Sequence, residues 1–147
     1  MHVREARAGE EDALLALYEW LFAPPGSRPP RWDETRARAA LTGALESPDA
    51  AVLVADDGGA LVGLCTAYLD LDSVRFGRRC WVEDLAVYPE RRSQGIGAAL
   101  LAAARDWASE RGATHLELDT GEARADAQRF YEREGPAWRS ISYAWML

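Results

Sequence analysis

Apolar residues recur along the first third of the chain with the spacing of helices. Leucine and tyrosine return every three or four residues between 10 and 22, where the first turn is acidic, so a helix is predicted there. A second helix is predicted to begin after Asp33, a good N-cap, and to end before Pro48. The proline-rich segment 23–30 between them is predicted to be a loop, because proline lacks the amide donor.

Strand patterns occupy the start and the middle of the sequence. Residues 3–6 predict a short first strand. Residues 51–55 and 61–71 predict a hairpin that turns at the glycine pair 58–59. A third run of strand-forming residues, 80–87, follows a polar turn.

The last third alternates between the two patterns. Helices are predicted at 96–110 and 124–134, and strands at 115–119 and 138–145. The whole order is β-α-α-β-β-β-α-β-α-β, which indicates the α/β class with a mixed sheet flanked by helices. The strand-helix-strand unit over 80–119 predicts a parallel crossover.

Composition narrows the class of protein. A length of 147 residues with 48% hydrophobic residues predicts a single domain over 1–147. No run approaches the ~20 apolar residues of a membrane helix, and the first residues lack the apolar core of a signal peptide, so no membrane contact and a cytoplasmic location are expected. The net charge of −7 disfavours nucleic acid as a partner.

The sequence contains two cysteines, two histidines and no lysine. Cys65 and Cys80 are expected about four residues out of register on adjacent strands, about 13 Å apart, which is too far for a disulfide. Both are therefore predicted to be reduced and buried. No histidine or cysteine has metal-ligand spacing, so no metal site is expected. All 17 basic residues are arginine, which excludes any chemistry that needs lysine.

The segment 91–98 joins a predicted strand to a helix. Gly95 and Gly97 let a ligand approach the backbone, and the free amides of a helix N-terminus bind phosphate. The segment has no Walker lysine, and Leu100 replaces the third small residue of the dinucleotide fingerprint. A phosphate or pyrophosphate ligand is one interpretation; a tight turn or close packing is the other.

Three motifs in order resemble one family. Residues 92–97, Arg-Ser-Gln-Gly-Ile-Gly, resemble the Gln/Arg-x-x-Gly-x-Gly/Ala acetyl-coenzyme A motif of the GNAT superfamily of N-acetyltransferases. Residues 82–89 resemble the family's fourth strand, and residues 127–135 resemble the helix that carries its conserved tyrosine. The resemblance implies a mostly antiparallel central sheet and an acetyl-CoA-dependent N-acetyltransferase, with acetyl-CoA as co-substrate.

The resemblance also implies how the cofactor is held. The backbone of residues 85–87 would pair with the pantetheine arm as an added strand, and the amides of residues 94–98 would take the pyrophosphate. The two arginines before the motif either lie near the nucleotide phosphates or are solvated. The implied cofactor-binding residues are Leu85, Ala86, Val87, Arg91, Arg92, Gln94, Gly95, Ile96, Gly97 and Ala98.

Amine acetylation needs a base, because an alkyl amine with a pKa near 10 is protonated at pH 7. Glu83 and Asp84 are the candidates, and we favour Glu83. Adjacent strand side chains point to opposite faces, although a bulge, which the family often has in this strand, changes that alternation. The resemblance implies that Tyr131 is the general acid for the departing thiolate; a core aromatic is the alternative.

The acceptor site is expected where the first two helices and their connection meet the sheet. Trp20, Phe22 and Trp32 are predicted to form its wall or lid, and Asp70 to offer counter-charge to a cationic amine. The expected acceptor is a primary amine of a small molecule or a peptide. The resemblance also makes a homodimer plausible.

Two other functions stay open at this stage: a non-catalytic acyl-CoA sensor or interaction module, and a different phosphate-binding domain. The sequence also departs from the family pattern at two positions. Arg124 stands where an asparagine often opens the tyrosine helix, and Pro136 stands where an aromatic usually follows Gly135. The second departure bears on the path of the last strand.

Overall fold

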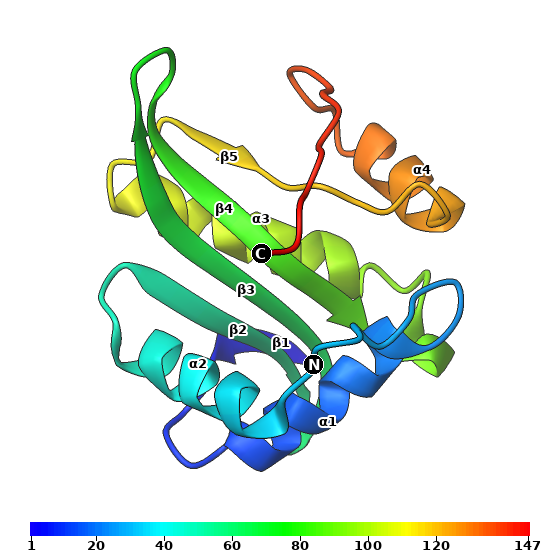
Figure 1. The fold of residues 1–147 in the computed structure, drawn as a ribbon. Helices are drawn as coiled ribbons and strands as arrows, with labels where there is room; N and C mark the ends of the chain where they lie inside the picture. The colour runs from blue at the N-terminus through cyan, green and yellow to red at the C-terminus, as the bar shows by residue number, and fades with distance from the viewer.

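The computed structural model describes residues 1–147 and has one five-stranded sheet in the order β1-β2-β3-β4-β5 (Figure 1). The first four strands pair antiparallel, and β5 pairs parallel with β4. The mixed, mostly antiparallel sheet and the parallel crossover are therefore confirmed. The strands are β1 (His2–Glu5), β2 (Ala50–Asp57), β3 (Ala60–Ser73), β4 (Gly77–Val87) and β5 (His115–Glu117).

Helices cover both faces of the sheet (Figure 1). On one face lie α1 (Glu11–Phe22) and α2 (Glu34–Glu46), and α3 (Ile96–Glu110) covers the other. A short 3-10 turn (Pro89–Arg91) precedes α3, and α4 (Ala125–Arg133) follows β5. As predicted, the Asp33 side chain caps α2, accepting the amide of Arg36 at 3.1 Å.

Two apolar layers sandwich the sheet. Leu100 and Trp107 of α3 pack with one face of the strands, and Leu14 of α1 and Leu41 of α2 pack with the other. Burial of these side chains supplies most of the driving force for folding.

The two cysteines lie in the layer under α3, where both are buried and unpaired. Cys80 lies opposite Leu69 in the β3–β4 ladder, and Leu69 is four residues along the strand from Cys65. This register confirms the predicted separation and the absence of a disulfide.

β4 and β5 diverge after a short shared stretch. Their pairing covers only Arg79–Trp81 of β4, whereas β3 pairs with β4 as far as Val87 on the other side. The remaining residues of β4, 82–87, therefore have an open backbone edge on the β5 side, and Figure 1 shows the two strands separating there. An open edge of this kind can accept another extended chain.

The strand predicted at 138–145 is wrong. Residues 136–147 form no strand, and Ile141, Tyr143 and Trp145 are 77%, 75% and 81% exposed. Alternating apolar residues form a strand only where a partner edge exists, and β5 offers three residues. The tail instead runs back across the molecule (Figure 1), and the Arg31 Nη1 donates to the Leu147 carbonyl at 2.5 Å.

None of the helices combines the length and the apolar character that crossing a bilayer needs. No three His, Cys, Asp or Glu side chains come together in a way that could hold a metal ion.

Candidate active site

A β-bulge in β4 sets the geometry of the site. Thr66 of β3 lies opposite Asp84 and Ala67 lies opposite Val82, so Glu83 is the extra residue. Val82 and Leu85 both pack in the layer under α3. The bulge therefore breaks the usual alternation, and Glu83 and Asp84 both face the α1–α2 side, where they line one cavity.

Asp84 is held firmly by neighbouring groups. The Tyr18 hydroxyl of α1 donates to its Oδ2 at 2.8 Å, and its backbone N–H donates to Thr66 Oγ1 at 3.1 Å. Burial raises the pKa of Asp84, and the Tyr18 hydrogen bond and the positive charge of Arg124 oppose that rise. The pKa of Tyr18 is raised well above its usual value by burial and by the Asp84 charge.

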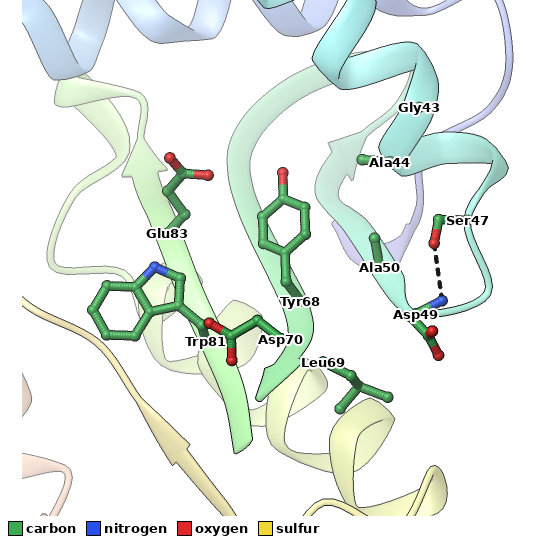
Figure 2. A pocket seen from close by; sticks show the side chains of 10 residues that line it. All are labelled: Gly43, Ala44, Ser47, Asp49, Ala50, Tyr68, Leu69, Asp70, Trp81 and Glu83. Carbon is green, nitrogen blue, oxygen red and sulfur yellow. Dashed lines mark hydrogen bonds between the residues drawn. The ribbon is translucent and has the colours of Figure 1, made fainter. Parts of the chain in front are cut away.

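Glu83 has no such partner. Its carboxylate makes no side-chain hydrogen bond or ion pair, and it projects into a cavity between α2 and the sheet (Figure 2). Partial burial raises the pKa of Glu83, and the negative charges of Asp84 and Asp119 raise it further. A free carboxylate with a raised pKa next to open space is suited to accept a proton at neutral pH.

Two adjoining cavities lie on this face. The larger has a volume of about 480 Å³ and runs from Glu83 toward the C-terminal end of α2 (Figure 2). The smaller, about 150 Å³, lies under α1 and α2 and includes Asp84. Tyr68 and Glu83 line both, so the free carboxylate lies where they meet.

The four predicted acceptor residues have different surroundings. Trp32 lines the smaller cavity, and Phe22 packs against it with ring centroids 4.8 Å apart. Trp20 instead packs on Tyr88, 5.1 Å away, and like Phe22 it is not among the residues that line either cavity. Asp70 lines the larger cavity, but Arg79 holds both of its oxygens, at 3.0 and 2.7 Å.

The loop before α3 presents an open helix N-terminus. Gly95 is the N-cap residue with φ +82°, and no side chain caps the helix. A Cβ built on Gly95 would have no atom within 4 Å, so the turn is open at this residue. Residues 92–95 are exposed. The free N–H groups and the helix dipole together favour an anion here.

Arg91 links the loop before α3 to strand β2. Its Nη1 donates to Asp57 at 2.7 Å and its Nε donates to the Gln94 side chain at 2.9 Å. Its guanidinium is therefore already bound within the chain, whereas Arg92 is exposed. This contact ties the loop to the end of β2.

α4 closes the site beside α3. The ring of Phe130 lies against Gly97, 3.5 Å from where a Cβ would be, so a glycine here brings α4 close. The neighbouring Tyr131 is partly buried, which raises its pKa to about 12. The charge of Arg124 opposes this rise, and the charges of Asp119 and Asp84 add to it.

The residues present fit a coenzyme A molecule. The open edge of β4 can pair with an extended pantetheine arm, and the uncapped start of α3 can hold its pyrophosphate. The two features are joined by the residues of a single short turn, 88–95.

Sequence reasoning missed three contributors. The helical spacing of Tyr18 indicates only that it lies on the apolar face of its helix, and nothing in it indicates a hydrogen bond to Asp84. Thr66 and Tyr68 lie in an apolar strand pattern, where their polar groups gave no signal. All three depend on the bulge, which brings Asp84 to the same face as these residues.

Comparison with known proteins agrees with the motifs. The model of the acetyltransferase (GNAT) family matches residues 14–135. The chain belongs to the GNAT family. Like that family, it is an N-acetyltransferase.

Among GNAT relatives, an uncharacterized N-acetyltransferase of Bacillus subtilis, YhfO, is 31% identical over 137 residues, covering 92% of this chain and 89% of its own. The aminoglycoside N(6')-acetyltransferase type 1 of Klebsiella aerogenes is 34% identical over 87 residues, 54% of each chain. The solved structure of AAC(6')-Iy with a bisubstrate analogue, CoA-S-monomethyl-acetylneamine, has a TM-score of 0.81 at 20% identity, over 99% of this chain and 97% of that one. It shows the same GNAT fold.

Proposed function

We propose that this GNAT protein transfers the acetyl group of acetyl-CoA directly to the primary amine of a small molecule. The observation that carries the proposal is the bulge that leaves Glu83 free at the junction of two cavities, beside the open edge of β4. An acceptor amine in either cavity reaches the same carboxylate. Acetyl-CoA supplies an activated acyl group when it is bound.

Each site residue then has a distinct part. Glu83 accepts the proton of the ammonium group, directly or through one water. Asp84, fixed by Tyr18 and Thr66, holds negative charge beside the incoming cation. Tyr131 keeps its proton on Oη, because its pKa is about 12, and can give it to a departing thiolate.

For the cofactor, we propose the residues that the family motif indicates. The backbone of 85–87 pairs with the pantetheine arm, and the amides of 94–98 bind the pyrophosphate. Arg91 contributes by bracing the loop through Asp57, and Arg92 is free to reach a phosphate. One domain, 1–147, supplies the whole site.

The larger cavity favours a small cationic acceptor over a peptide. It is bounded on one side by α2 and has a volume of about 480 Å³, within the range of small-molecule sites. Tyr68 and Trp81 offer aromatic surface, and Glu83 offers a carboxylate without an ion-pair partner. Asp49 and Asp70 also line this cavity, but they are paired with Arg78 and Arg79. The name of the Klebsiella relative indicates an aminoglycoside acceptor for that protein, which supports amines of this class for the first screen.

The proposal is tested by thiol release from acetyl-CoA. The purified chain is incubated with acetyl-CoA and a panel of aminoglycosides, polyamines, amino acids and peptide amines. We expect amine-dependent release with at least one small cationic amine and none with the matching N-acetylated amine. Tight CoA binding without turnover on the whole panel would contradict the proposal and favour a sensor.

The cofactor site is tested with two alanine substitutions on one helix. Gly95→Ala and Gly112→Ala both place a side chain at positive φ, +82° and +83°, with open space around it, so both cost about 1–2 kcal/mol of stability. Only Gly95 touches the proposed pyrophosphate site. We expect CoA to raise the Tm of Gly112→Ala as it does for the wild type, and Gly95→Ala to lose most of this rise. Equal rises in both variants would remove the pyrophosphate site from this turn.

We also propose a homodimer that uses the C-terminal tail. Apolar surface is exposed at Trp138 and at Ile141, Tyr143, Trp145 and Leu147. The last four alternate as in a strand and have no strand partner in the same chain. A second copy can supply that partner. We expect a dimer by sedimentation, and a monomer after deletion of residues 138–147. A wild-type monomer at micromolar concentration would refute the dimer.

A further inference from the structure

The C-terminal end of α1 is stabilised by a side chain from a distant part of the chain. The last carbonyl groups of a helix lack helical partners, and α1 has no basic residue in its last turn. The Arg124 Nη2 donates to the Leu21 carbonyl at 2.8 Å, across 103 positions of sequence. A cation at a helix C-terminus is favourable, because the helix dipole is negative there.

The loop after α1 is built around this contact. A Cβ on Gly26 would collide with both the Leu21 carbonyl oxygen and the Arg124 guanidinium. Only glycine therefore fits at position 26 while the contact is in place. Arg124 is also the N-cap residue of α4, so the contact joins the start of α4 to the end of α1.

The same guanidinium also acts on polar groups of the site. Its charge acts on Asp84 and on Tyr131, and in both cases it favours the ionised form. Asp84 is bound by Tyr18 of α1, and Tyr131 belongs to α4. Arg124 therefore links the two helices that carry these polar groups, through its hydrogen bond to Leu21 of α1 and its place at the start of α4.

We propose that Arg124 is a positioning residue that locks the tyrosine helix α4 to the end of α1 and supplies one positive charge that acts on Asp84 and Tyr131. This inference rests on the proposed function, since it assigns Arg124 to the same reaction. It also gives a role to the position where the family often has asparagine. A longer side chain with a charge can span from α4 to the Leu21 carbonyl.

Five variants separate the charge from the contact. Arg124→Lys keeps the charge, Arg124→Gln keeps a neutral donor, and Arg124→Met keeps only the apolar stem. Arg129→Gln is the matched control, because Arg129 lies on the same helix, is exposed and pairs only with Asp126. Gly26→Ala disturbs the contact from the opposite side.

The first readout is the pH profile of kcat/KM for the best amine. Loss of the positive charge raises the pKa of Asp84 and of Tyr131, so the whole profile should move to higher pH in Arg124→Gln and Arg124→Met. On the acidic limb we expect kcat/KM to fall by about threefold or more. Arg124→Lys should restore most of the profile, and Arg129→Gln should match the wild type. An unshifted profile in Arg124→Gln overturns the electrostatic role.

The second readout does not need activity. The free energies of unfolding of Gly26→Ala, Arg124→Met and the double variant form a cycle, and a shared contact makes the two effects less than additive. Additive effects would overturn the inference that Arg124 links α4 to the end of α1. If the wild type releases no thiol with any amine, the proposed function fails and the electrostatic role fails with it. The cycle still tests whether Arg124 links α4 to α1.

Discussion

Replacing Glu83 by glutamine is expected to lower kcat/KM for the amine by about 10²–10⁴-fold, the usual contribution of a general base. The amide keeps the shape of the side chain and cannot accept the proton. Because Glu83 makes no side-chain hydrogen bond, no other contact is lost. CoA should still raise the Tm, since the start of α3 is unchanged. The measurement is steady-state thiol release across pH, together with a thermal-shift titration of CoA.

Asp84→Asn is the matched control for this variant. Tyr18 and Thr66 already hold Asp84, so its substitution should act by altering charge and position rather than by removing the base. We expect a smaller loss than in Glu83→Gln. A larger loss in Asp84→Asn would reverse the assignment of the two carboxylates. The apparent pKa on the acidic limb belongs to the pair, because the two groups interact.

The raised pKa of Glu83 also makes the stability of the folded protein depend on pH. The unfolded chain ionises this carboxyl at its ordinary pKa, and the folded protein ionises it only at higher pH. Between those pH values the folded state binds more protons, so this group makes the protein less stable as pH rises. Glu83→Gln should therefore raise the Tm slightly at pH 8 and leave it unchanged below the ordinary pKa of glutamate.

How much of this site could be predicted from the sequence depends on the kind of information each residue carries. The open turn before α3 could be predicted from its glycines, because the left-handed backbone at Gly95 favours glycine. Its use as a phosphate site stays a prediction. The capped start of α2 and the glycine turn of the β2–β3 hairpin are equally local. Local rules predict local geometry well.

The bulge at Glu83 could not be derived from alternation alone. A bulge depends on how two strands pair, and the register of β3 against β4 shifts between Thr66 and Ala67 without a glycine or proline to mark it. Only the family resemblance suggested one. Its consequence is that two adjacent carboxylates share a face, and the proposed assignment of the base depends on this.

In the C-terminal tail, a clear sequence pattern does not give the element that it predicts. Residues 138–145 have a clear strand pattern, yet a strand also needs a partner, and a sequence does not say where that partner is. Pro136, where the family usually has an aromatic, lies at the point where the chain leaves α4. The tail contact with Arg31 and the stacking of Trp138 on Phe76, 5.0 Å apart, replace the expected ladder.

The second large effect is expected from Tyr131→Phe, which should lower kcat by about 10²-fold or more while KM for the amine changes little. The substitution removes only the hydroxyl. The ring contact with Phe130, at 5.1 Å between centroids, and the packing of α4 on Gly97 stay in place. A loss of kcat can then be assigned to the missing proton on Oη.

Tyr68→Phe is the control variant for Tyr131→Phe. Burial raises the pKa of Tyr68 to about 12 as well, but Tyr68 lines the acceptor cavities. It should change KM for the amine more than kcat. Because Tyr131 also has a pKa of about 12, the wild-type kcat should show no decline from loss of its proton between pH 7 and about pH 10. Full kcat in Tyr131→Phe would leave the thiolate to be protonated by water, and α4 would then serve the cofactor only through Phe130.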